Sequence, residues 1–395
     1  MIEIKKFENE IFTENKKYQS QYSEAALINE KYMKGETRLV TEQARYPLPT
    51  LNELFSKGNA YELQPDFQRR KGRWSIEKKS KLIESFIINV PVPPVFLYEV
   101  SYANYEVMDG LQRISTIIDY YNDKFELAGL IQWSELNGMK YSQLPDKIKE
   151  GIDRRYLSSI ILLNESASDP EKAMQMKQLV FERLNTGGEM LSGQEIRNAI
   201  YNGKMNDRCI KLSDNEIFKR LWGLKNDNAS ADEKDSLYRN MGDVELVLRF
   251  FAMRFVDKFT GKLDIFLDNY LKSANMFPEK TLDMLEEQFL RNINVAYHLL
   301  DDKAFKIYKH RYVSLDWSSD AQRTVYDPMM IALTQLQLTD EEIEASNKIE
   351  LVKKLEKFYE DHEDDFDGKK QSRSDIQHRA EILYNFLTSY FNRKV

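Results

Sequence analysis

The sequence predicts an α+β protein in which a small mixed sheet with helices is followed by an all-helical C-terminal domain. Residues 105–108 form a short, apolar-leaning run, and the Asp109-Gly110 turn after them leads into apolar residues at helical spacing over 114–121. Residues 159–163 are a β-branched run, which is typical of a strand. Residues 244–255 carry apolar side chains at helical spacing, which indicates a helix of the core.

Composition excludes several classes of protein. The chain has 57 basic and 64 acidic residues, and its net charge of −7 argues against a globally basic coat for nucleic acid, though not against a local basic patch. The single cysteine, Cys209, rules out a disulfide framework within one chain and disfavours a cysteine-based zinc site. No apolar run approaches membrane-spanning length, and the N-terminus mixes charges of both signs. We therefore expect a cytoplasmic protein with no membrane partner.

The length of 395 residues leaves room for two domains. Residues 1–45 are polar and charged, and we expect them to form an N-terminal extension. The predicted α+β domain covers residues 46–205, and the predicted helical domain covers residues 206–395. The sequence is compatible with an oligomer.

Local signals place the first elements of the α+β domain. The run Tyr46-Pro47-Leu48-Pro49 breaks any helix, and Thr50 is expected to cap a short helix that ends near residue 56. Pro91-Val92-Pro93-Pro94 reads as a rigid, extended connector before a strand over residues 95–98. A further helix over 145–156 precedes the strand at 159–163.

The strand–turn–helix at 105–121 brings Asp109, Gly110, Gln112 and Arg113 to a helix N-terminus. Such a terminus offers unbonded backbone N–H groups and the positive end of a helix dipole, which suit an anion such as phosphate. Arg113 adds donors whose geometry matches a phosphate group. An ordinary strand–turn–helix with a solvated arginine explains these residues as well, and taken alone they favour that simpler interpretation.

A second informative stretch is residues 63–74, LQPDFQRRKGRW, a predicted loop that crowds Gln68, Arg69 and Arg70 beside Trp74. A charge run is usually a solvated loop. Trp74 is expected to be buried and to anchor this loop, however, and an anchored arginine is costly to hold without an acidic or phosphate partner. We therefore expect Gln68 and Arg69 to face the same pocket as Asp109.

Ser75 follows this loop and is a good N-cap for a helix that runs to about residue 89. The predicted buried face of that helix consists of Leu82, Ile83, Phe86, Ile87 and Val90.

The third stretch is residues 180–198, VFERLNTGGEMLSGQEIRN. A helix from about residue 170 is predicted to end at Asn185-Thr186-Gly187-Gly188, because two glycines permit a left-handed turn. Ser192 and Glu195 have the spacing of a capping box that starts a new helix. A structural connector explains all of these residues. Two arginines remain unexplained by it: Arg183 and Arg197.

The C-terminal half shows further amphipathic segments over about 280–311, 322–337 and 340–361. The acidic run at 360–367 reads as a solvated loop, with a metal site as the weaker alternative. The four histidines show no H-E-x-x-H spacing, and no His–Asn–His ββα pattern of an HNH nuclease is present. We therefore interpret His362 and His378 as surface residues, and HNH nuclease activity is not expected.

Taken in order, FQRRKGRW, VPVPP, VMDGLQRISTI and VFERLNTGGEMLSGQEIRNA resemble the DUF262 family, the ParB/sulfiredoxin-like N-terminal module of GmrSD-type, modification-dependent restriction systems. The resemblance covers about residues 45–260. It implies a ParB/sulfiredoxin-like fold and a module that binds nucleotide, often hydrolyses NTP, and serves DNA-targeting defence.

The family's D-G-Q-Q-R motif maps onto residues 109–113 of this sequence. The sequence departs from it at Leu111, where the family usually has Gln, so one polar contact is in doubt. The gap between Arg69 and Trp74 is also one residue longer than the commoner family spacing.

Roles follow from what phosphoryl transfer needs, which is charge neutralisation, an oriented water molecule and usually Mg²⁺. Arg113, Arg69 and Arg70 can neutralise phosphate charge. Asp109 could hold Mg²⁺ or orient water, and Gln112 and Gln68 could position water or a base edge. Further candidates for nucleotide binding lie at the two turns: Gly110, Arg183, Asn185, Gly187 and Gly188, with Glu182 beside them.

The sequence excludes two related mechanisms. No G-x-x-x-x-G-K-[ST] motif is present, so the chain is not a P-loop NTPase. A sulfiredoxin-type reductase would need a cysteine in the turn, and residues 108–113 are MDGLQR.

The leading hypothesis is an NTP-binding and NTP-hydrolysing protein of a prokaryotic DNA-targeting defence system, with Mg²⁺ as its metal. The alternatives are a non-catalytic module that senses nucleotide or DNA for a partner nuclease, and a direct DNA nuclease of the ParB-like fold. DNA and a partner nuclease are therefore the candidate partners beside the nucleotide. Nucleotide turnover separates the first hypothesis from the second, and metal-dependent nicking of plasmid isolates the third.

Overall fold

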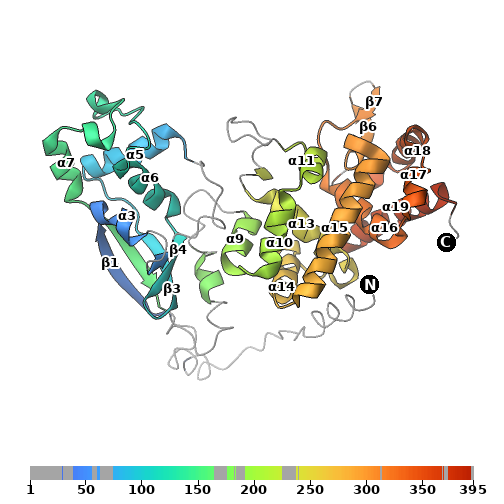
Figure 1. Cartoon of the computed structure of the whole chain (residues 1–395), viewed down its shortest axis with the longest axis horizontal. Coiled ribbons are helices and arrows are strands. Elements are labelled where there is room, and N and C mark those ends of the chain that lie inside the picture. The colour runs from blue at the N-terminus through green and yellow to red at the C-terminus, as the bar shows by residue number, and fades with distance from the viewer. Residues whose placement is uncertain are drawn as a thin grey trace. The chain divides into compact units, whose positions relative to one another are not determined.

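The computed structural model divides the chain into two compact units, which meet in sequence at Ile200 and Tyr201. Figure 1 shows both units as ribbons. The structure describes residue 29 and residues 39–55, 60–62, 74–163, 176–181, 183, 192–224, 237–238, 240–311, 314–366, 368 and 372–392. No helix in these parts of the chain is both long and apolar enough to cross a membrane.

The N-terminal unit is built on a mixed sheet, which confirms the predicted α+β class. Its described strands are β1 (Thr41–Pro47), β2 (Tyr61–Glu62), β3 (Val95–Ser101), β4 (Asn104–Asp109) and β5 (Tyr156–Leu162). They lie in the order β1-β5-β3-β4-β2. The β1–β5 and β3–β4 pairs are antiparallel, whereas β3–β5 and β2–β4 are parallel.

The described helices of this unit are α3 (Leu51–Leu54), α5 (Ile76–Ile87), α6 (Leu111–Tyr121), α7 (Asp146–Asp153) and α9 (Gly193–Ile200), with short 3₁₀ turns at Leu48–Thr50, Ser134–Leu136 and Tyr141–Gln143. Of the predicted caps, Ser75 accepts a hydrogen bond from the Lys78 amide at 3.3 Å and so caps α5 as expected. Thr50 does not cap α3, because its hydroxyl donates to the Pro47 carbonyl at 2.8 Å.

One face of the sheet carries the apolar core of the unit. Helices α5 and α6 cover this face (Figure 1), and their buried residues pack against Val95, Leu97 and Val107 of the strands. The predicted buried face of α5 is confirmed at Leu82, Ile83 and Phe86, while Ile87 is only partly buried. Val90 is 50% exposed, because α5 ends at Ile87 and the chain there no longer follows the helical period.

The opposite face of the sheet holds a buried ion pair that the sequence analysis missed. Side chains alternate along a strand, so Glu106 points away from the side that Val107 shares with the core. Residues 176–181 are helical, and the Lys177 ammonium forms an ion pair with Glu106. The same ammonium lies 5.2 Å from the centre of the Tyr98 ring and donates to the Ala199 carbonyl at 3.2 Å. Lys177 therefore joins the sheet to the end of α9.

The C-terminal unit is a helical assembly, as predicted. Its described helices are α10 (Lys204–Ser213), α11 (Glu216–Trp222), α13 (Gly242–Met253), α14 (Leu263–Ala274), α15 (Glu279–Leu300), α16 (Arg323–Leu336), α17 (Asp340–Glu344), α18 (Lys348–Asp361) and α19 (Arg373–Tyr390), with 3₁₀ turns at Val256–Lys258, Asp301–Lys303 and Glu363–Asp365 (η8). Every residue of α13 except Glu245 is buried. Arg249 of α13 forms a buried, bidentate ion pair with Asp327 of α16, in which Nε donates to Oδ1 at 3.1 Å.

One part of the prediction for this unit was wrong, because the unit is not entirely helical. Strands β6 (Tyr308–Arg311) and β7 (Ser314–Trp317) form an antiparallel hairpin (Figure 1), and β6 contacts α18. The amphipathic segment predicted to extend to residue 311 ends at Leu300 in α15. Strands of four residues are too short to impose a visible alternation, so the helical period was extended over them.

Candidate functional site

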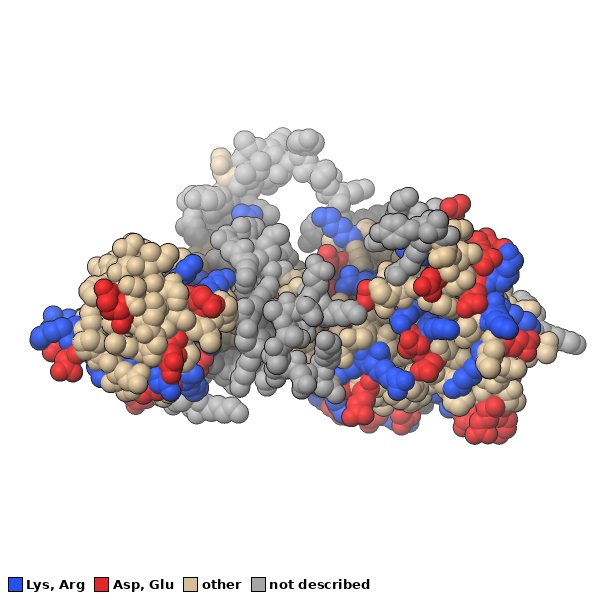
Figure 2. Space-filling model, turned by 90° about the horizontal axis from the view of Figure 1, so that it is seen from above, with Lys and Arg blue, Asp and Glu red and all other residues tan. Residues whose placement is uncertain are grey.

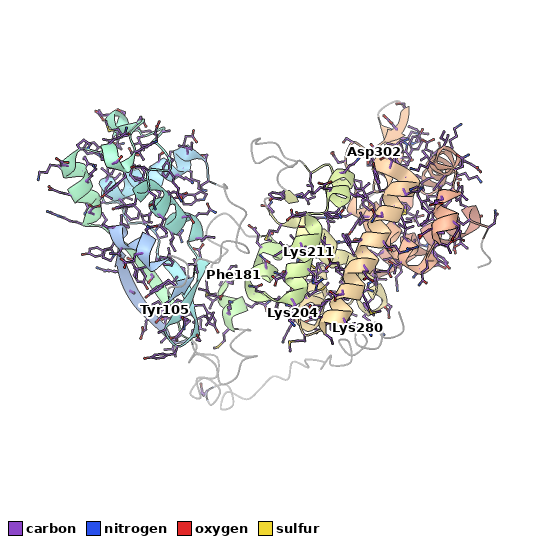
Figure 3. The ribbon with its side chains drawn as sticks, viewed as in Figure 1. Tyr105, Phe181, Lys204, Lys211, Lys280 and Asp302 are labelled. Atoms are coloured by element: carbon purple, nitrogen blue, oxygen red, sulfur yellow. The ribbon has the colours of Figure 1, made fainter. Side chains whose placement is uncertain are left out.

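The predicted strand–turn–helix is present and forms the centre of the candidate site. Strand β4 ends at Asp109, α6 begins at Leu111, and Gly110 between them has a left-handed backbone with φ of 101°. Tyr105, labelled in Figure 3, marks the first part of β4. A Cβ atom on Gly110 would lie 2.3 Å from Cγ1 of the buried Val95. Only glycine therefore fits here, both for its backbone conformation and for the close approach of β3.

Arg113 does not extend into solvent as a free side chain. Its Nη2 donates to Oδ2 of Asp109 at 2.6 Å and to the Pro94 carbonyl at 3.2 Å. The side chain is 17% exposed, compared with 47% for Asp109. The Nε atom is buried and makes no hydrogen bond to a described residue. The simpler interpretation, a solvated arginine, is wrong: Arg113 is folded back onto the turn that precedes its helix.

The N-terminus of α6 is not closed by a side chain of any described residue. No side chain caps this terminus among the described residues, and the first turn contains no acidic residue. The first N–H groups of a helix have no partner within it and carry a partial positive charge. Gln112 lies in this turn and is partly exposed. The terminus is thus compatible with an anionic ligand.

The basic loop falls largely outside the described residues. Gln68, Arg69 and Arg70 belong to the part that is not described, so the prediction that they face Asp109 stays a prediction. Trp74 packs against the core of the N-terminal unit, but its side chain is only half-buried. The Lys78 ammonium covers its ring at 4.9 Å from the centre. The expected anchor is present, although it is not the fully buried one that was predicted.

The third stretch is described in part. Arg183 is exposed, and Glu182, Asn185, Gly187 and Gly188 lie outside the described residues. The capping box at the start of α9 is confirmed, since the Glu195 amide donates to the Ser192 hydroxyl at 3.1 Å and the Ser192 amide donates to Glu195 at 2.8 Å.

Helix α9 buries polar side chains that the sequence analysis did not single out as a group. Gln194, Glu195 and Asn198 are each 0% exposed, and Arg197 is 1% exposed. Arg197 donates to the Gln194 side chain at 3.3 Å. An eight-residue helix with four buried polar side chains is unusual, because each must be hydrogen-bonded. Arg197, which the connector interpretation left unexplained, is therefore an interior residue.

Possible metal ligands and an open pocket also bear on the candidate site. Among the described residues, no three His, Cys, Asp or Glu side chains are arranged to hold a metal ion. An open pocket of about 610 Å³ lies at the start of α5, between residues 124–129 and 137–140. None of the predicted site residues that the structure describes lines this pocket. The turn at 109–113 and its contacts therefore define the candidate site.

Residues 51–202 match the model of one protein family, described as the GmrSD restriction endonuclease, N-terminal domain. The match covers the turn at 109–113, the basic loop and all of the third stretch, and over this range it confirms the resemblance seen in the sequence. Residues 203–260, to which the resemblance was extended, lie outside the match. No curated protein and no solved structure matches the chain.

Proposed function

We propose that residues 51–202 form a nucleoside-triphosphate-binding module, which hydrolyses its nucleotide with Mg²⁺ in a DNA-targeting restriction or anti-phage system. The observation that carries the proposal is the turn at 109–113. There the N-terminus of α6, which has no side-chain cap among the described residues, lies beside the Arg113 side chain that Asp109 binds. The match to the GmrSD N-terminal domain supports the restriction context.

Phosphate binding is the part of this proposal that the geometry supports best. The amides at the start of α6 would donate to phosphate oxygens, and Gly110 would let the phosphate approach the backbone closely. Arg113 would neutralise phosphate charge. The proposal extends to the undescribed Gln68, Arg69, Arg70, Asn185, Gly187 and Gly188, and to the exposed Arg183, which would complete the nucleotide site from the two neighbouring stretches.

Hydrolysis would need a water molecule aligned with the terminal phosphate. Gln112, which is partly exposed in the first turn of α6, and the carboxylate of Asp109 are the polar side chains of the turn that could orient it. Mg²⁺ would accompany the nucleotide, because this ion usually keeps several of its water molecules and binds to the substrate phosphates.

The test begins with nucleotide affinity. Arg113→Ala should weaken the binding of ATP or GTP by about 10- to 150-fold, since a hydrogen bond to a charged group contributes about 1.5–3 kcal/mol. Arg154→Ala is the matched control, because Arg154 is exposed at the end of α7. Equal affinity of wild type and a folded Arg113→Ala protein would refute phosphate binding at this turn.

Turnover is then measured as phosphate release from each of the four NTPs, with and without DNA. Release that depends on Mg²⁺ and is lost in Arg113→Ala would establish the hydrolase. Tight binding with no release would instead identify the module as a nucleotide sensor, which is the alternative that the sequence left open.

A further inference from the structure

Two groups from different segments bind one nitrogen of the Arg113 guanidinium, and the backbone of the turn lies directly beside it. Asp109, at the end of β4, binds Nη2 at 2.6 Å, and the carbonyl of Pro94 binds the same nitrogen at 3.2 Å. Nη2 also lies 3.1 Å from the position that a Cβ on Gly110 would take. The side chain therefore rests directly on the backbone of the turn, and any larger residue at position 110 would push it away.

The carbonyl of Pro94 is a fixed point rather than part of a loose loop. It ends the connector Pro91-Val92-Pro93-Pro94, whose prolines restrict the backbone, and the next residue is Val95, the first of β3. Val95 is 0% exposed and packs against Gly110. The proline-rich connector thus has a role that neither the fold nor the proposed function had given it. It supplies a hydrogen-bond acceptor, the Pro94 carbonyl, whose position is set by the packing of Val95 in the core.

Asp109 is engaged with a cation in this arrangement. Its Oδ2 accepts a charge-assisted hydrogen bond, so a Mg²⁺ ion on the same oxygen would lie within about 4 Å of the guanidinium. Two cations at that separation repel strongly even near a protein surface. Meanwhile the Arg113 Nη1 makes no hydrogen bond to a described residue and remains for a ligand.

From these contacts we infer that Asp109 and the Pro94 carbonyl are positioning groups that aim Arg113 at the nucleotide phosphate, and that Asp109 is not a ligand of Mg²⁺. This inference rests on the proposed function, because it assigns a role within the same site. A side chain pre-set in this way loses less freedom on binding than a solvated arginine would.

The test is a double-mutant cycle with wild type, Asp109→Asn, Arg113→Ala and the double variant. Affinity for fluorescently labelled ATP and GTP is measured once with Mg²⁺ and once with EDTA. A positioning role predicts that Asp109→Asn weakens binding by about tenfold in both conditions. It also predicts no further effect of Asp109→Asn once Arg113 is Ala, because the carboxylate then has nothing to position.

A metal ligand would give the opposite pattern. The loss on Asp109→Asn would then appear only with Mg²⁺ and would persist in the Arg113→Ala background, and either result overturns the inference while leaving nucleotide binding intact. Failure of the wild-type protein to bind either labelled nucleotide would refute the proposed function, and the inference with it.

The control for simple loss of an ion pair is Asp119→Asn. Asp119 lies on the same helix and pairs with Lys79 at 3.1 Å and Lys124 at 3.2 Å, away from the turn. It should leave nucleotide affinity unchanged in both conditions. Thermal unfolding of each variant establishes that affinity is compared between folded proteins. A loss on Asp119→Asn as large as that on Asp109→Asn would show that the effect is structural, and would overturn the inference.

Discussion

At the scale of single residues, Gly110 decides whether the candidate site can form. The position combines a φ of 101° with contact to Val95, so a side chain would meet both backbone strain and a packed neighbour. The sequence indicated the strain, because Asp-Gly is a turn signal. It could not indicate the contact, since Val95 lies on a different strand and approaches only in the folded sheet.

We predict that Gly110→Ala lowers the free energy of unfolding of the N-terminal unit by about 2–5 kcal/mol. The left-handed backbone accounts for about 1–2 kcal/mol of this loss, and overpacking against Val95 accounts for the rest. Gly138→Ala is the control, because Gly138 has φ of 83° but no atom within 4 Å of the added carbon. Urea unfolding of both variants should therefore show the larger loss at Gly110, and similar losses would mean that Val95 moves aside at little cost.

Other single-residue predictions succeeded when their signal was local and failed when it was not. Ser75 and the Ser192–Glu195 box were confirmed, because an N-cap forms within four residues of chain. The prediction that Thr50 caps a helix was wrong, because its hydroxyl donates to the Pro47 carbonyl instead. Lys177 carried no signal at all, since its partners Glu106 and Ala199 are brought to it by the fold.

At the scale of elements, the start of α10 shows a cap that comes from a distant segment. Gly203 precedes the helix and has no side chain to offer. The Asn275 side chain accepts from the amides of Met205 at 3.0 Å and Asn206 at 3.1 Å, and donates to the Tyr201 carbonyl at 2.7 Å. No pattern near residue 203 could have predicted this arrangement, because the capping residue follows α14.

Helices α10 and α15 are also joined by a ladder of ion pairs. Lys204 and Lys211, both labelled in Figure 3, lie on α10 and pair with Glu279 at 2.8 Å and Glu286 at 2.7 Å of α15. Arg208 lies between them and contacts Glu286 as well. Burial raises the pKa of Glu286, but hydrogen bonds from Lys211 and Arg208 outweigh it, so the pKa is lower than usual.

This lowered pKa predicts how the ladder responds to acid. A carboxylate with a depressed pKa in the folded state stabilises the protein above its unfolded pKa, near 4.5, and the gain is lost as pH falls through the folded pKa. Glu286→Gln should therefore cost about 1 kcal/mol of unfolding free energy near pH 7 and less as the pH falls below about 4.

The measurement is urea unfolding followed by far-UV circular dichroism, once near pH 7 and once at a pH below about 4. Glu287→Gln is the control, because Glu287 is the exposed neighbour on α15. An equal cost of Glu286→Gln at both pH values would show that the side chain acts through its shape rather than its charge.

At the scale of the whole molecule, the sequence predicted the fold class and the motif order better than the site. Apolar patterns indicated β3, β4, β5 and the C-terminal helices α13, α15, α16 and α18. They did not indicate β1, which lies mostly in the predicted N-terminal extension, nor the two-residue β2 and the four-residue strands of the β6–β7 hairpin. The candidate site residues were predicted from the chemistry of their side chains. Their pairing, above all that of Arg113 with Asp109 and Pro94, depends on how three segments meet.

Charge distribution on the C-terminal unit gives no single-sign field on the face shown in Figure 2. Basic and acidic side chains are intermixed there. A nucleic-acid surface usually concentrates Lys and Arg on one face. The described residues of the C-terminal unit show no such concentration of basic side chains on this face.

Three of the four histidines of the C-terminal unit contact one acidic turn. His310 contacts Glu363 at 3.0 Å, and His362 and His378 contact Asp365 at 3.2 and 3.6 Å. Both carboxylates belong to η8, the turn between α18 and α19. His378 is exposed and His362 partly exposed, in keeping with the surface positions predicted for them.

We predict that the purified protein does not cut unmodified duplex DNA. An HNH nuclease needs a histidine base beside metal ligands, so that a metal-activated water molecule can attack the phosphate. His362 instead pairs with Asp365 at the end of α18, and its acidic neighbours follow one another in sequence, so their side chains point in different directions.

The assay for this prediction is incubation of the purified protein with supercoiled plasmid, Mg²⁺ or Mn²⁺, and NTP. His298→Ala is the control for His362→Ala, since His298 is an exposed histidine on α15. Linearisation that disappears in His362→Ala but survives in His298→Ala would show that the C-terminal unit is itself a nuclease. Linearisation that survives both changes but is lost in Arg113→Ala would place the cutting in the N-terminal unit.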